Sequence, residues 1–419
     1  MTTQAAGSRG AQSSVLSPQS FDFEAIVVGG GPGGSTTAAL LAEAGHRVML
    51  LDKASFPRHK ACSEYVNPAG VRLLRELGIE SELEERDAHR MEAMLIHAPG
   101  GGHFLADFAG AEPGRTALGL SRYRLDHLLL QRAEAAGVTV CQRAHVRDLL
   151  IEGGRVGGVV VTIDGRRETL RAPLVIGADG RHSVVSRALR LDAPVRWPRR
   201  TGLVAHYRGV TGLDRWGEMH VARHGYAGLA LLEDGLTNVA FVADAVAVTG
   251  REGTLEHFFA DGLARIPEVA SKLAGAERVG EIRGVGPMAR RARQTAGDGF
   301  LLVGDAASFL DPFTGEGIYE ALRAARLAAP VASAALRAGD TSATALAPYR
   351  AARRRAFTAK RQVCWLIQAF IHTPTLMDYA AERLDRRPAT AQTLTGVLGD
   401  FRPAHQALSP LFLARLLRP

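Results

Sequence analysis

The 419-residue sequence predicts an α/β fold in which a Rossmann-like domain is interleaved with a β-sheet domain and followed by a helical C-terminal region. Three observations support this prediction. A strand–glycine turn–helix–strand pattern lies near the N-terminus. Two later apolar runs that end in glycine, near 174–180 and 299–304, have the pattern of buried parallel strands. Between these two runs, residues 191–283 alternate as short strands, which indicates a separate sheet.

The N-terminal pattern is a βαβ unit. Residues 23–28 (FEAIVV) form an apolar run that leads into glycines, which predicts a buried strand. Residues 35–44 have helical composition, and Gly45 supplies a C-terminal stop. Residues 47–51 predict a second strand that ends at Asp52. A strand, helix and strand within about thirty residues predict parallel strands joined by a right-handed crossover.

The middle of the chain adds further elements of both kinds. Residues 121–136 have helical periodicity, and a strand (VTVC) follows Gly137. Residues 156–170 predict a hairpin around Asp164-Gly165, a dipeptide favoured in tight turns. A short helix is expected near 183–190.

The C-terminal part predicts helices. A long Ala/Leu-rich helix is expected from Gly317 to Leu336. The remaining residues, 341–419, are expected to be helical, with stops at prolines 374, 388, 403 and 410. The apolar patch CWLIQAFI (364–371) predicts packing surface, and a peripheral membrane or partner contact through this region is the alternative.

These patterns give a domain division. Residues 1–20 are expected to form a disordered tail, because they are rich in Ser, Gln and Gly and lack periodic apolar residues. The Rossmann-like domain is assigned to 21–90, 121–190 and 284–340, the substrate domain to 91–120 and 191–283, and the helical region to 341–419.

Composition narrows the functional classes. Hydrophobic residues make up 46% and charged residues 22% of the chain, as in ordinary globular proteins. No apolar stretch is long enough for a transmembrane helix. The three scattered cysteines argue against disulfides and fit a cytoplasmic location. The net charge of +8 is spread without an arginine–aromatic block, so nucleic acid is not an expected partner. The histidine spacing predicts no metal site.

The glycine turn of the βαβ unit predicts a phosphate-binding loop. Its glycines permit a tight turn, close approach of a pyrophosphate, and close packing of the helix against the strand. The free N–H groups at the helix N-terminus would face the phosphates, and a carboxylate at the end of the second strand would accept from ribose hydroxyls. The residues assigned to this site are Gly29, Gly31, Pro32, Gly33, Gly34, Asp52 and the adjacent Lys53.

Two later motifs separate FAD from other dinucleotides by resemblance. LVIGADGRHSVVSRAL (174–189) and GFLLVGDAASFLDPFTGEGI (299–318) resemble the Asp-Gly and Gly-Asp motifs of the group A flavoprotein hydroxylase superfamily. The resemblance implies a glutathione-reductase-type domain with non-covalent FAD and a passing nicotinamide cofactor. It implies that Asp305 binds the ribityl chain and that Asp179 and Gly180 lie near the pyrophosphate. Arg122 matches the superfamily's arginine that approaches the FAD phosphates.

The loop after the third motif has an independent physical meaning. Pro312, Gly315 and Gly317 precede the long helix, and Ile318 lies in its first turn. A backbone-rich loop at a positive helix end would stabilise an anionic reduced flavin. The alternative is a helix cap followed by a core helix.

A fourth motif points to a narrower branch. FPRHKACSEYVNP (56–68) resembles the Pro-Arg-x-Lys-x-Cys element of the geranylgeranyl-reductase-like and related monooxygenase branch. The resemblance places Arg58 and Lys60 close to the cofactor and Cys62 at the flavin pocket, as an apolar wall residue or, alternatively, as a nucleophile. The polar residues that follow are substrate contacts or turn residues; they are Glu64, Tyr65 and Asn67.

A later segment resembles the substrate-domain strands of the same branch. HGYAGLALLEDGLTNVAFV (224–242) would place Tyr226 at a flavin-facing turn. The aromatic element of developed reductases and the Trp-x-Trp-x-Ile-Pro signature of flavin halogenases are not reproduced. This departure counts against halogenation and weakens the case for prenyl reduction.

Together these features predict an FAD-dependent monooxygenase of secondary metabolism. NAD(P)H would act as a transient electron donor and O2 as oxidant, to hydroxylate or epoxidise a small apolar or aromatic natural product of polyketide or isoprenoid type. The pocket-lining catalytic candidates are Cys62, Tyr226 and Pro312. The main alternative is a geranylgeranyl-reductase-like ene-reductase with Cys62 or Tyr226 as proton donor. Further alternatives are a flavin dehydrogenase or oxidase, a halogenase, and a non-enzymatic flavin-binding protein.

Overall fold

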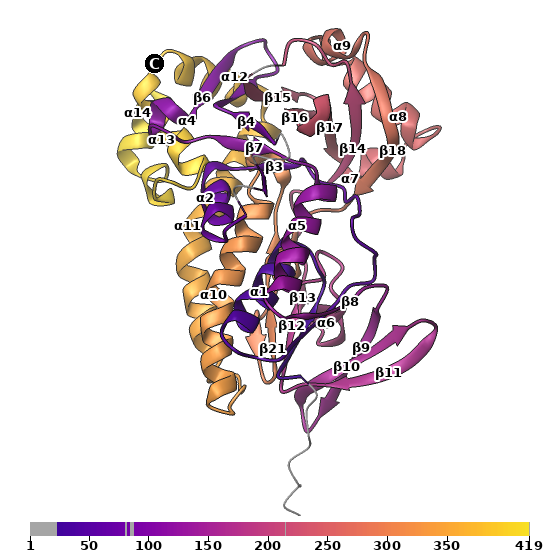
Figure 1. Cartoon of the computed structure of the whole chain (residues 1–419). Helices are drawn as coiled ribbons and strands as arrows, with labels where there is room; N and C mark the ends of the chain where they lie inside the picture. Colours follow the sequence, from indigo (N-terminus) through magenta and orange to yellow (C-terminus); the bar gives the residue numbers. More distant parts are fainter. Residues whose placement is uncertain (1–22, 80–81, 84–87, 214, 419) are drawn as a thin grey trace, which may run out of the picture.

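A parallel sheet of buried strands forms the centre of the lower half of the molecule (Figure 1). The computed structural model describes residues 23–79, 82–83, 88–213 and 215–418, so the expected tail at 1–20 lies outside the described residues. The strand order is β20-β21-β12-β1-β2-β8, and only the edge strand β20 is antiparallel. The strands are β1 (Ala25–Val28), β2 (Val48–Leu51), β8 (Thr139–Cys141), β12 (Leu174–Gly177), β20 (Ala296–Gly297) and β21 (Phe300–Leu302).

Alternate residues of this sheet build two different cores, because side chains of a strand point to opposite faces in turn. Ala25 and Val27 pack in the core with α1 (Pro32–Glu43), α5 (Arg122–Ala135) and α10 (Gly317–Arg337). Ile26 and Val28 pack against the other layer, an antiparallel sheet. Its strands are β9 (His145–Glu152), β10 (Arg155–Ile163) and β11 (Arg166–Arg171). The expected βαβ unit and hairpin are therefore present.

The helix of the βαβ unit begins earlier than predicted. α1 starts at Pro32, which occupies its first turn, rather than at Ser35. Proline is well tolerated there because its missing N–H would have no partner inside the helix. The prediction treated the glycine turn and the helix as separate, whereas Gly33 and Gly34 already belong to the helix.

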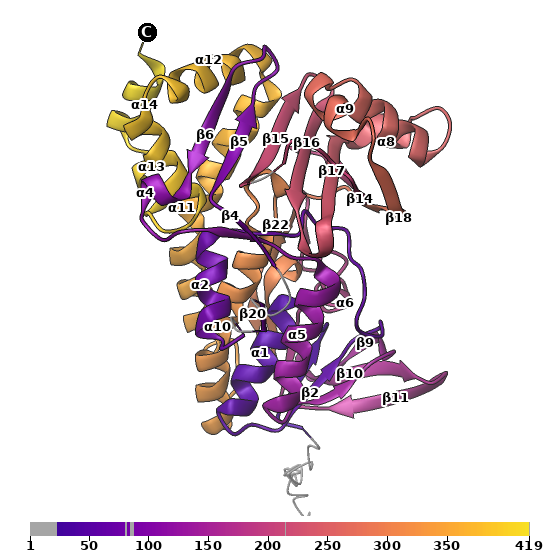
Figure 2. The same ribbon diagram turned by 45° about the horizontal axis from the view of Figure 1, so that its top comes forward.

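The upper half is built on a seven-stranded sheet with the order β18-β14-β17-β16-β15-β5-β6. Strand β5 pairs in parallel with β15, which brings two distant segments of the chain into one sheet. Figure 2 shows this sheet between α8 and α9 on one side and the C-terminal helices on the other. The strands are β5 (Ala93–His97), β6 (His103–Asp107), β14 (Arg200–Arg208), β15 (Trp216–Ala222), β16 (Gly225–Leu231), β17 (Leu236–Asp244) and β18 (Glu277–Val285); the helices are α7 (Ala245–Thr249), α8 (Leu255–Ala264) and α9 (Pro267–Leu273).

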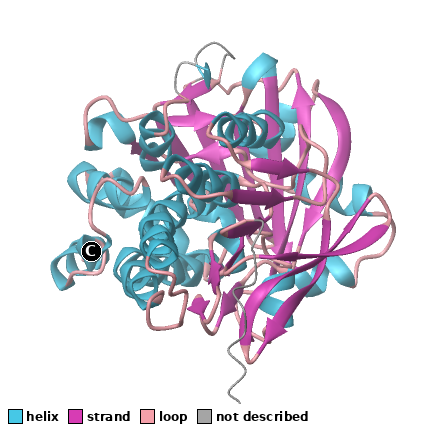
Figure 3. Ribbon diagram, turned by 60° about the horizontal axis from the view of Figure 1, so that its bottom comes forward, coloured by secondary structure: helices cyan, strands magenta, loops and turns pink. Residues whose placement is uncertain are grey.

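The C-terminal region is helical, as predicted. Prolines 374, 388 and 410 stand at helix starts, where they also end the preceding segment. These helices cover one face of the seven-stranded sheet through a shared apolar core. Figure 3 shows them gathered to one side of the strands. They are α11 (Ala347–His372), α12 (Pro374–Asp385), α13 (Pro388–Leu398) and α14 (Pro410–Leu417).

Short elements connect the two halves. A small sheet of β3 (Tyr65–Val66), β7 (Ala117–Gly119) and β4 (His89–Met91) lies between them, next to α2 (Pro68–Glu76). A second small sheet pairs β13 (Asp192–Ala193), β19 (Arg290–Ala292) and β22 (Ser308–Phe309). The predicted fold class, a Rossmann-like domain interleaved with a sheet domain and completed by helices, is confirmed. Within the described part of the chain, no helix combines the length and the apolar character needed to cross a bilayer.

Candidate flavin and substrate site

The glycine turn brings helix α1 very close to strand β1. A Cβ on Gly34 would overlap the carbonyl oxygen of Gly29, so a side chain there would push the helix away from the strand. No side chain of the described residues caps α1 at Gly31, and the first turn of α1 holds no acidic residue. The N–H groups at this end therefore remain available for an anion.

Asp52 closes the same end of the sheet. Its carboxylate accepts from the backbone N–H of Gly30 at 2.7 Å and from that of Ala54 at 2.8 Å. These bonds orient the carboxylate at the end of β2, with lone pairs left over for ribose hydroxyls. The neighbouring Lys53 is exposed.

Two arginines meet one buried carboxylate beside the glycine turn. Arg122 Nε and Nη2 donate to the two oxygens of Asp126, each at 2.7 Å, and Arg58 Nη1 donates to Asp126 at 2.8 Å. Burial raises the pKa of Asp126, but the charge and hydrogen bonds of Arg122 more than offset this, so the net pKa is lowered. Two cations on one anion leave a net positive charge. The guanidinium of Arg122 lies 3.7 Å from the position of a Cβ on Gly31.

The second and third motifs line the same space. The Lys60 amine lies 3.5 Å from the position of a Cβ on Gly180, which itself has a positive φ of 79°. Asp179 Oδ2 accepts from the N–H of Val184 at 2.6 Å, and its other oxygen is buried and has no partner among the described residues. Asp305 lies in a short 3-10 turn after β21, where its charge acts on Lys60.

The loop before α10 forms the inner end of this space. Gly315 has a left-handed φ of 65°, and a Cβ there would overlap the ring of Tyr65. The carboxylate of Asp311 accepts from the N–H of Phe313 at 3.0 Å and holds the turn at Pro312. Gly317 and Ile318 begin the helix, and Ile318 is buried in the core around α2 and α5.

These residues fit FAD. Two glycines face cations, Gly31 facing Arg122 and Gly180 facing Lys60, so anionic phosphates would meet backbone N–H groups and positive charge together. The partnerless oxygen of Asp179 offers a further acceptor. When bound, FAD supplies two-electron redox chemistry, and the protein supplies its position and electrostatic surroundings.

An apolar pocket adjoins the loop at Pro312–Gly315. It measures about 690 Å³ with its open mouth, and it lies between this loop and the seven-stranded sheet. The structure thus brings Tyr65 and Pro312 from the predicted list into one wall, whereas Cys62 and Tyr226 do not line this pocket. Typical lining side chains are Tyr65, Ile96, Phe108, Met219, Phe313 and Leu398.

Two of the predicted substrate residues have structural partners. Glu64 is buried, and its carboxylate accepts from the N–H of Arg122 at 2.8 Å and from the amide of Asn238 at 2.9 Å, with His206 bonded to the same oxygen as Asn238. Asn67 caps α2 by accepting from the N–H of Gly70 at 2.8 Å. These hydrogen bonds give Glu64 and Asn67 structural roles, as the turn-residue alternative expects. A contact of either residue with the substrate stays a prediction.

Two catalytic candidates lie outside the lining of the apolar pocket. Tyr226 is the second residue of β16, directly after the turn that joins β15 to β16, and it is 2% exposed. Its hydroxyl donates to Asp311 at 2.6 Å, because a buried phenol needs a hydrogen-bond partner. The Cys62 thiol lies beside Arg122, and its side chain packs against the α2–α5 core. Both interpretations of Cys62, an apolar wall residue or a nucleophile, stay predictions.

A buried charge network was missed by sequence reasoning. The Lys360 ammonium lies 3.0 Å from Glu316 and 3.0 Å from Asp400, and it also donates to the carbonyl of Val397. Asp400 in turn accepts from Asn67 at 2.9 Å. Lys360 is only 3% exposed. The network connects the C-terminal helices to the loop before α10. The sequence did not indicate it, because a single lysine in a helical segment does not show which distant carboxylates it meets.

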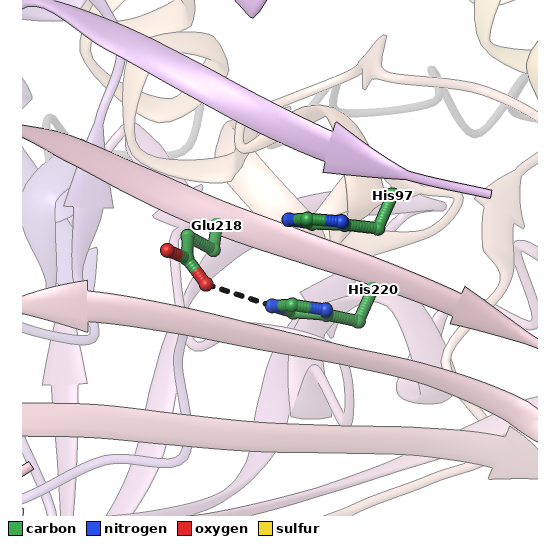
Figure 4. Close-up of side chains that lie close together, drawn as sticks. All are labelled: His97, Glu218 and His220. Carbon is green, nitrogen blue, oxygen red and sulfur yellow. Dashed lines mark hydrogen bonds and ion pairs between the residues drawn. The ribbon is translucent and has the colours of Figure 1, made fainter. Parts of the chain in front are cut away.

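A second cluster lies on β5 and β15 of the seven-stranded sheet, next to Lys272 of α9. Figure 4 shows His97, Glu218 and His220, whose ligand atoms all lie within 4.8 Å of one another. His97 lies opposite His220 because β5 and β15 pair in parallel. These residues are far apart in sequence, so the spacing of the histidines did not reveal the cluster.

The geometry of this cluster does not favour a metal. The two imidazoles stack at 4.3 Å with planes 4° apart, so their in-plane lone pairs do not converge on one point. The Glu218 carboxylate is already paired with His220 at 2.8 Å and with the Lys272 ammonium at 3.0 Å. The arrangement is that of a buried ion pair beside a stacked histidine, and we assign it no metal.

Related proteins point to the same cofactor. Residues 22–364 match the model of the FAD binding domain family. The chain is 33% identical over 346 residues to digeranylgeranylglycerophospholipid reductase 2 of Methanopyrus kandleri, covering 79% of this chain and 82% of that protein. It is 31% identical over 326 residues to menaquinone reductase of Mycolicibacterium smegmatis, covering 73% and 75%.

Solved structures share the fold. The flavin-dependent brominase Bmp2 superposes with a TM-score of 0.80 at 19% identity, covering 90% of this chain and 93% of that chain. A geranylgeranyl bacteriochlorophyll reductase-like protein of Thermoplasma acidophilum gives 0.77 at 21% identity, covering 92% and 98%. At these identities the likeness supports the fold alone. With the family match and the geometry of the cofactor site, the chain belongs to the FAD binding domain family and is an FAD-dependent oxidoreductase.

Proposed function

We propose that the protein is a flavin-dependent ene-reductase that saturates a carbon–carbon double bond of an isoprenoid chain, with NAD(P)H as the electron donor. The observation that carries the proposal is the apolar pocket beside the loop at Pro312–Gly315. An isoprenoid chain offers only apolar surface, and each CH2 group that it buries contributes about 0.8 kcal/mol. Relatives at 33% and 31% identity are named reductases of a digeranylgeranyl lipid and of menaquinone, which supports the same choice.

The chain's own residues would bind and orient such a substrate. Aliphatic side chains of β5 and β15, such as Ile96 and Met219, form one wall, and Phe108 and Phe313 narrow the pocket. Leu398, from the end of α13, closes it from the C-terminal side. A wall of this kind excludes water and holds the double bond against the loop before α10. The substrate is a small molecule in this proposal, and no residue is assigned to nucleic acid.

Monooxygenation of an apolar natural product is the second candidate. The same pocket favours it, because an apolar, water-poor wall protects an oxygen-transfer reaction as well as a reduction. It needs O2 as a co-substrate and leaves one oxygen atom in the product, whereas the reduction adds two hydrogen atoms. The mass of the product therefore distinguishes the two reactions.

The deciding experiment uses holoenzyme reduced with NADPH or NADH. The reduced enzyme is mixed with geranylgeraniol, a menaquinone or digeranylgeranylglycerophospholipid, first without oxygen and then with ¹⁸O2. Anaerobic reoxidation of the flavin together with a product two mass units heavier supports the ene-reductase. No anaerobic reaction, with ¹⁸O found in the product under oxygen, supports the monooxygenase and overturns our proposal.

A further inference from the structure

We propose that Tyr65 is the proton donor of the reaction, through a hydroxyl that faces the pocket; this inference rests on the proposed reduction of a double bond. Tyr65 starts strand β3, and its ring lies against Gly315 in the loop before α10. It also lines the apolar pocket. The residue therefore lies between the cofactor loop and the space assigned to the substrate.

The Tyr65 hydroxyl is free to meet a ligand. The residue is 9% exposed, and no group of the described residues hydrogen-bonds its hydroxyl. Its oxygen is not one of the fully buried polar atoms that lack a partner, so solvent can reach it and water can satisfy it until a ligand enters. A bound ligand with a reacting or polar atom at this point would satisfy it.

Other candidate donors are occupied or too weak. The Tyr226 hydroxyl is bonded to Asp311 at 2.6 Å and lies outside the pocket lining. The Glu64 carboxylate is held by three partners from the protein. The Glu218 carboxylate also lines the pocket, but it is paired with His220 at 2.8 Å and with Lys272 at 3.0 Å, and its pKa is lowered, so it carries no proton to donate. The Thr314 hydroxyl is engaged with the Cys364 thiol. Ser63 has an aliphatic hydroxyl, which is intrinsically a weaker acid than a phenol in the same surroundings. Tyr65 is thus the acid best placed among the described pocket residues.

The surroundings keep the Tyr65 phenol in its proton-carrying form. Burial raises the pKa of Tyr65; the positive charge of Lys360 opposes this rise, while Asp400 and Glu316 add to it. The net direction is upward, so the hydroxyl holds its proton at neutral pH. The nearby ammonium of Lys360 would stabilise the phenolate that forms when the proton leaves.

The step balances in atoms and charge. One carbon of the double bond receives a hydride equivalent from the reduced cofactor, and the other carbon receives the phenolic proton as the O–H bond breaks. The π bond is lost and two C–H bonds form, so the alkene is reduced by two electrons that NAD(P)H supplies. The phenolate regains a proton from water when the product leaves.

The test compares wild type, Tyr65→Phe and Tyr207→Phe as FAD-loaded proteins. We expect Tyr65→Phe to keep its FAD content, its NAD(P)H-driven flavin reduction and its flavin spectral shift on binding geranylgeraniol. Anaerobic reoxidation by the alkene should slow at least 100-fold, the range over which a general acid acts. In D2O, wild type should place at least one solvent deuterium in each reduced product and show a solvent isotope effect on this step. That effect should change in Tyr65→Phe.

The outcomes separate the two proposals. If wild type shows no anaerobic reoxidation with any probe, the proposed reduction is wrong and the role of Tyr65 falls with it. If wild type reduces the probe and Tyr65→Phe stays within threefold of it, the reduction stands and the proton-donor assignment is overturned. A merely structural role would instead lower FAD content or probe binding in Tyr65→Phe and leave the isotope effect unchanged. Tyr207→Phe is the matched control, because it removes a half-buried hydroxyl of β14 that lies outside the pocket and the cofactor site.

Discussion

The cofactor site and the substrate pocket touch each other at one loop, but they are built on opposite principles. The cofactor site is polar, and its charges are arranged in pairs that leave a surplus of positive charge near Gly31. The pocket is apolar, and its polar groups are few. The cofactor site is suited to anionic phosphates, and the pocket is suited to a ligand with apolar surface.

This difference also appears in how each region is assembled. The cofactor site is made of short contiguous motifs at the ends of parallel strands, where backbone and glycine geometry do most of the binding. The pocket is made where β3, the seven-stranded sheet and α13 meet, from segments far apart in sequence. A motif can therefore reveal the first region, whereas only packing creates the second.

The largest expected effect comes from the tightest contact of the cofactor site. Gly34→Ala places a Cβ onto the Gly29 carbonyl oxygen, so α1 must move away from β1. We expect a loss of about 4 kcal/mol or more in the free energy of unfolding and little bound FAD, because such clashes belong to the severe class. Denaturation and the flavin-to-protein absorbance ratio measure both.

Gly275→Ala is the control for this prediction. Gly275 is exposed, and no atom lies within 4 Å of its Cβ position. Its change should stay within about 0.5 kcal/mol. Normal FAD content in Gly34→Ala would show that the turn is less constrained than this geometry implies.

The second prediction concerns the charge network on the pocket side. Lys360→Met leaves the Glu316 and Asp400 carboxylates buried without their cation, which should cost about 3–5 kcal/mol. Urea denaturation measures it, with Arg354→Met, an exposed position of the same helix, as the control. A loss below 1 kcal/mol, roughly a surface effect, would contradict the view that this network anchors the C-terminal helices.

The third prediction returns to the cofactor site with a milder change. Asp305→Ala should weaken FAD binding by roughly 10- to 100-fold, the usual cost of a hydrogen bond to a charged group. FAD titration of the apo-protein, followed by flavin fluorescence, measures the change. Asp340→Ala, whose carboxylate only accepts from the N–H of Ser342, is the control. Unchanged affinity in Asp305→Ala would refute the assignment to the ribityl chain.

The smallest expected effect lies at the stacked histidines of β5 and β15. Burial, and then the positive potential of His220, lower the pKa of His97 to about 4. As pH falls below the ordinary pKa near 6.5, His97 becomes protonated in the unfolded chain, whereas in the folded protein it stays neutral until about pH 4. Stability is therefore lost between these two values. Because His97 is half-buried, solvent screening keeps this contribution under about 1 kcal/mol.

His97→Gln should flatten the decline of stability between pH 6.5 and pH 4. Thermal unfolding across this range measures it, and the exposed His405→Gln is the matched control. An identical pH curve for His97→Gln and wild type would show that the stacked pair does not contribute to acid sensitivity.

Much of the cofactor site could be predicted from sequence. The glycine turn and Asp52 lie within one βαβ unit, so their relation follows from local geometry. The pairing of Arg122 and Arg58 on Asp126 could not be predicted, because it depends on how α5 packs beside the turn. Sequence also did not reveal that Tyr226, next to the β15–β16 turn, is buried and bonded to Asp311, because strand pairing decides which face of the sheet its side chain takes.

The sequence by itself determined the fold class, since strands, helices and phosphate loops depend on neighbours within a few turns of chain. It indicated FAD through the resemblance of its later motifs to those of a known superfamily. Tertiary structure alone decided which tyrosine faces the pocket, which lysine binds two buried carboxylates, and that His97 stacks on His220. These relations arise from the register of β5 on β15 and from the docking of the C-terminal helices. The physical reason is that burial and pairing energies depend on distances across the fold, and a single sequence carries no direct record of those distances.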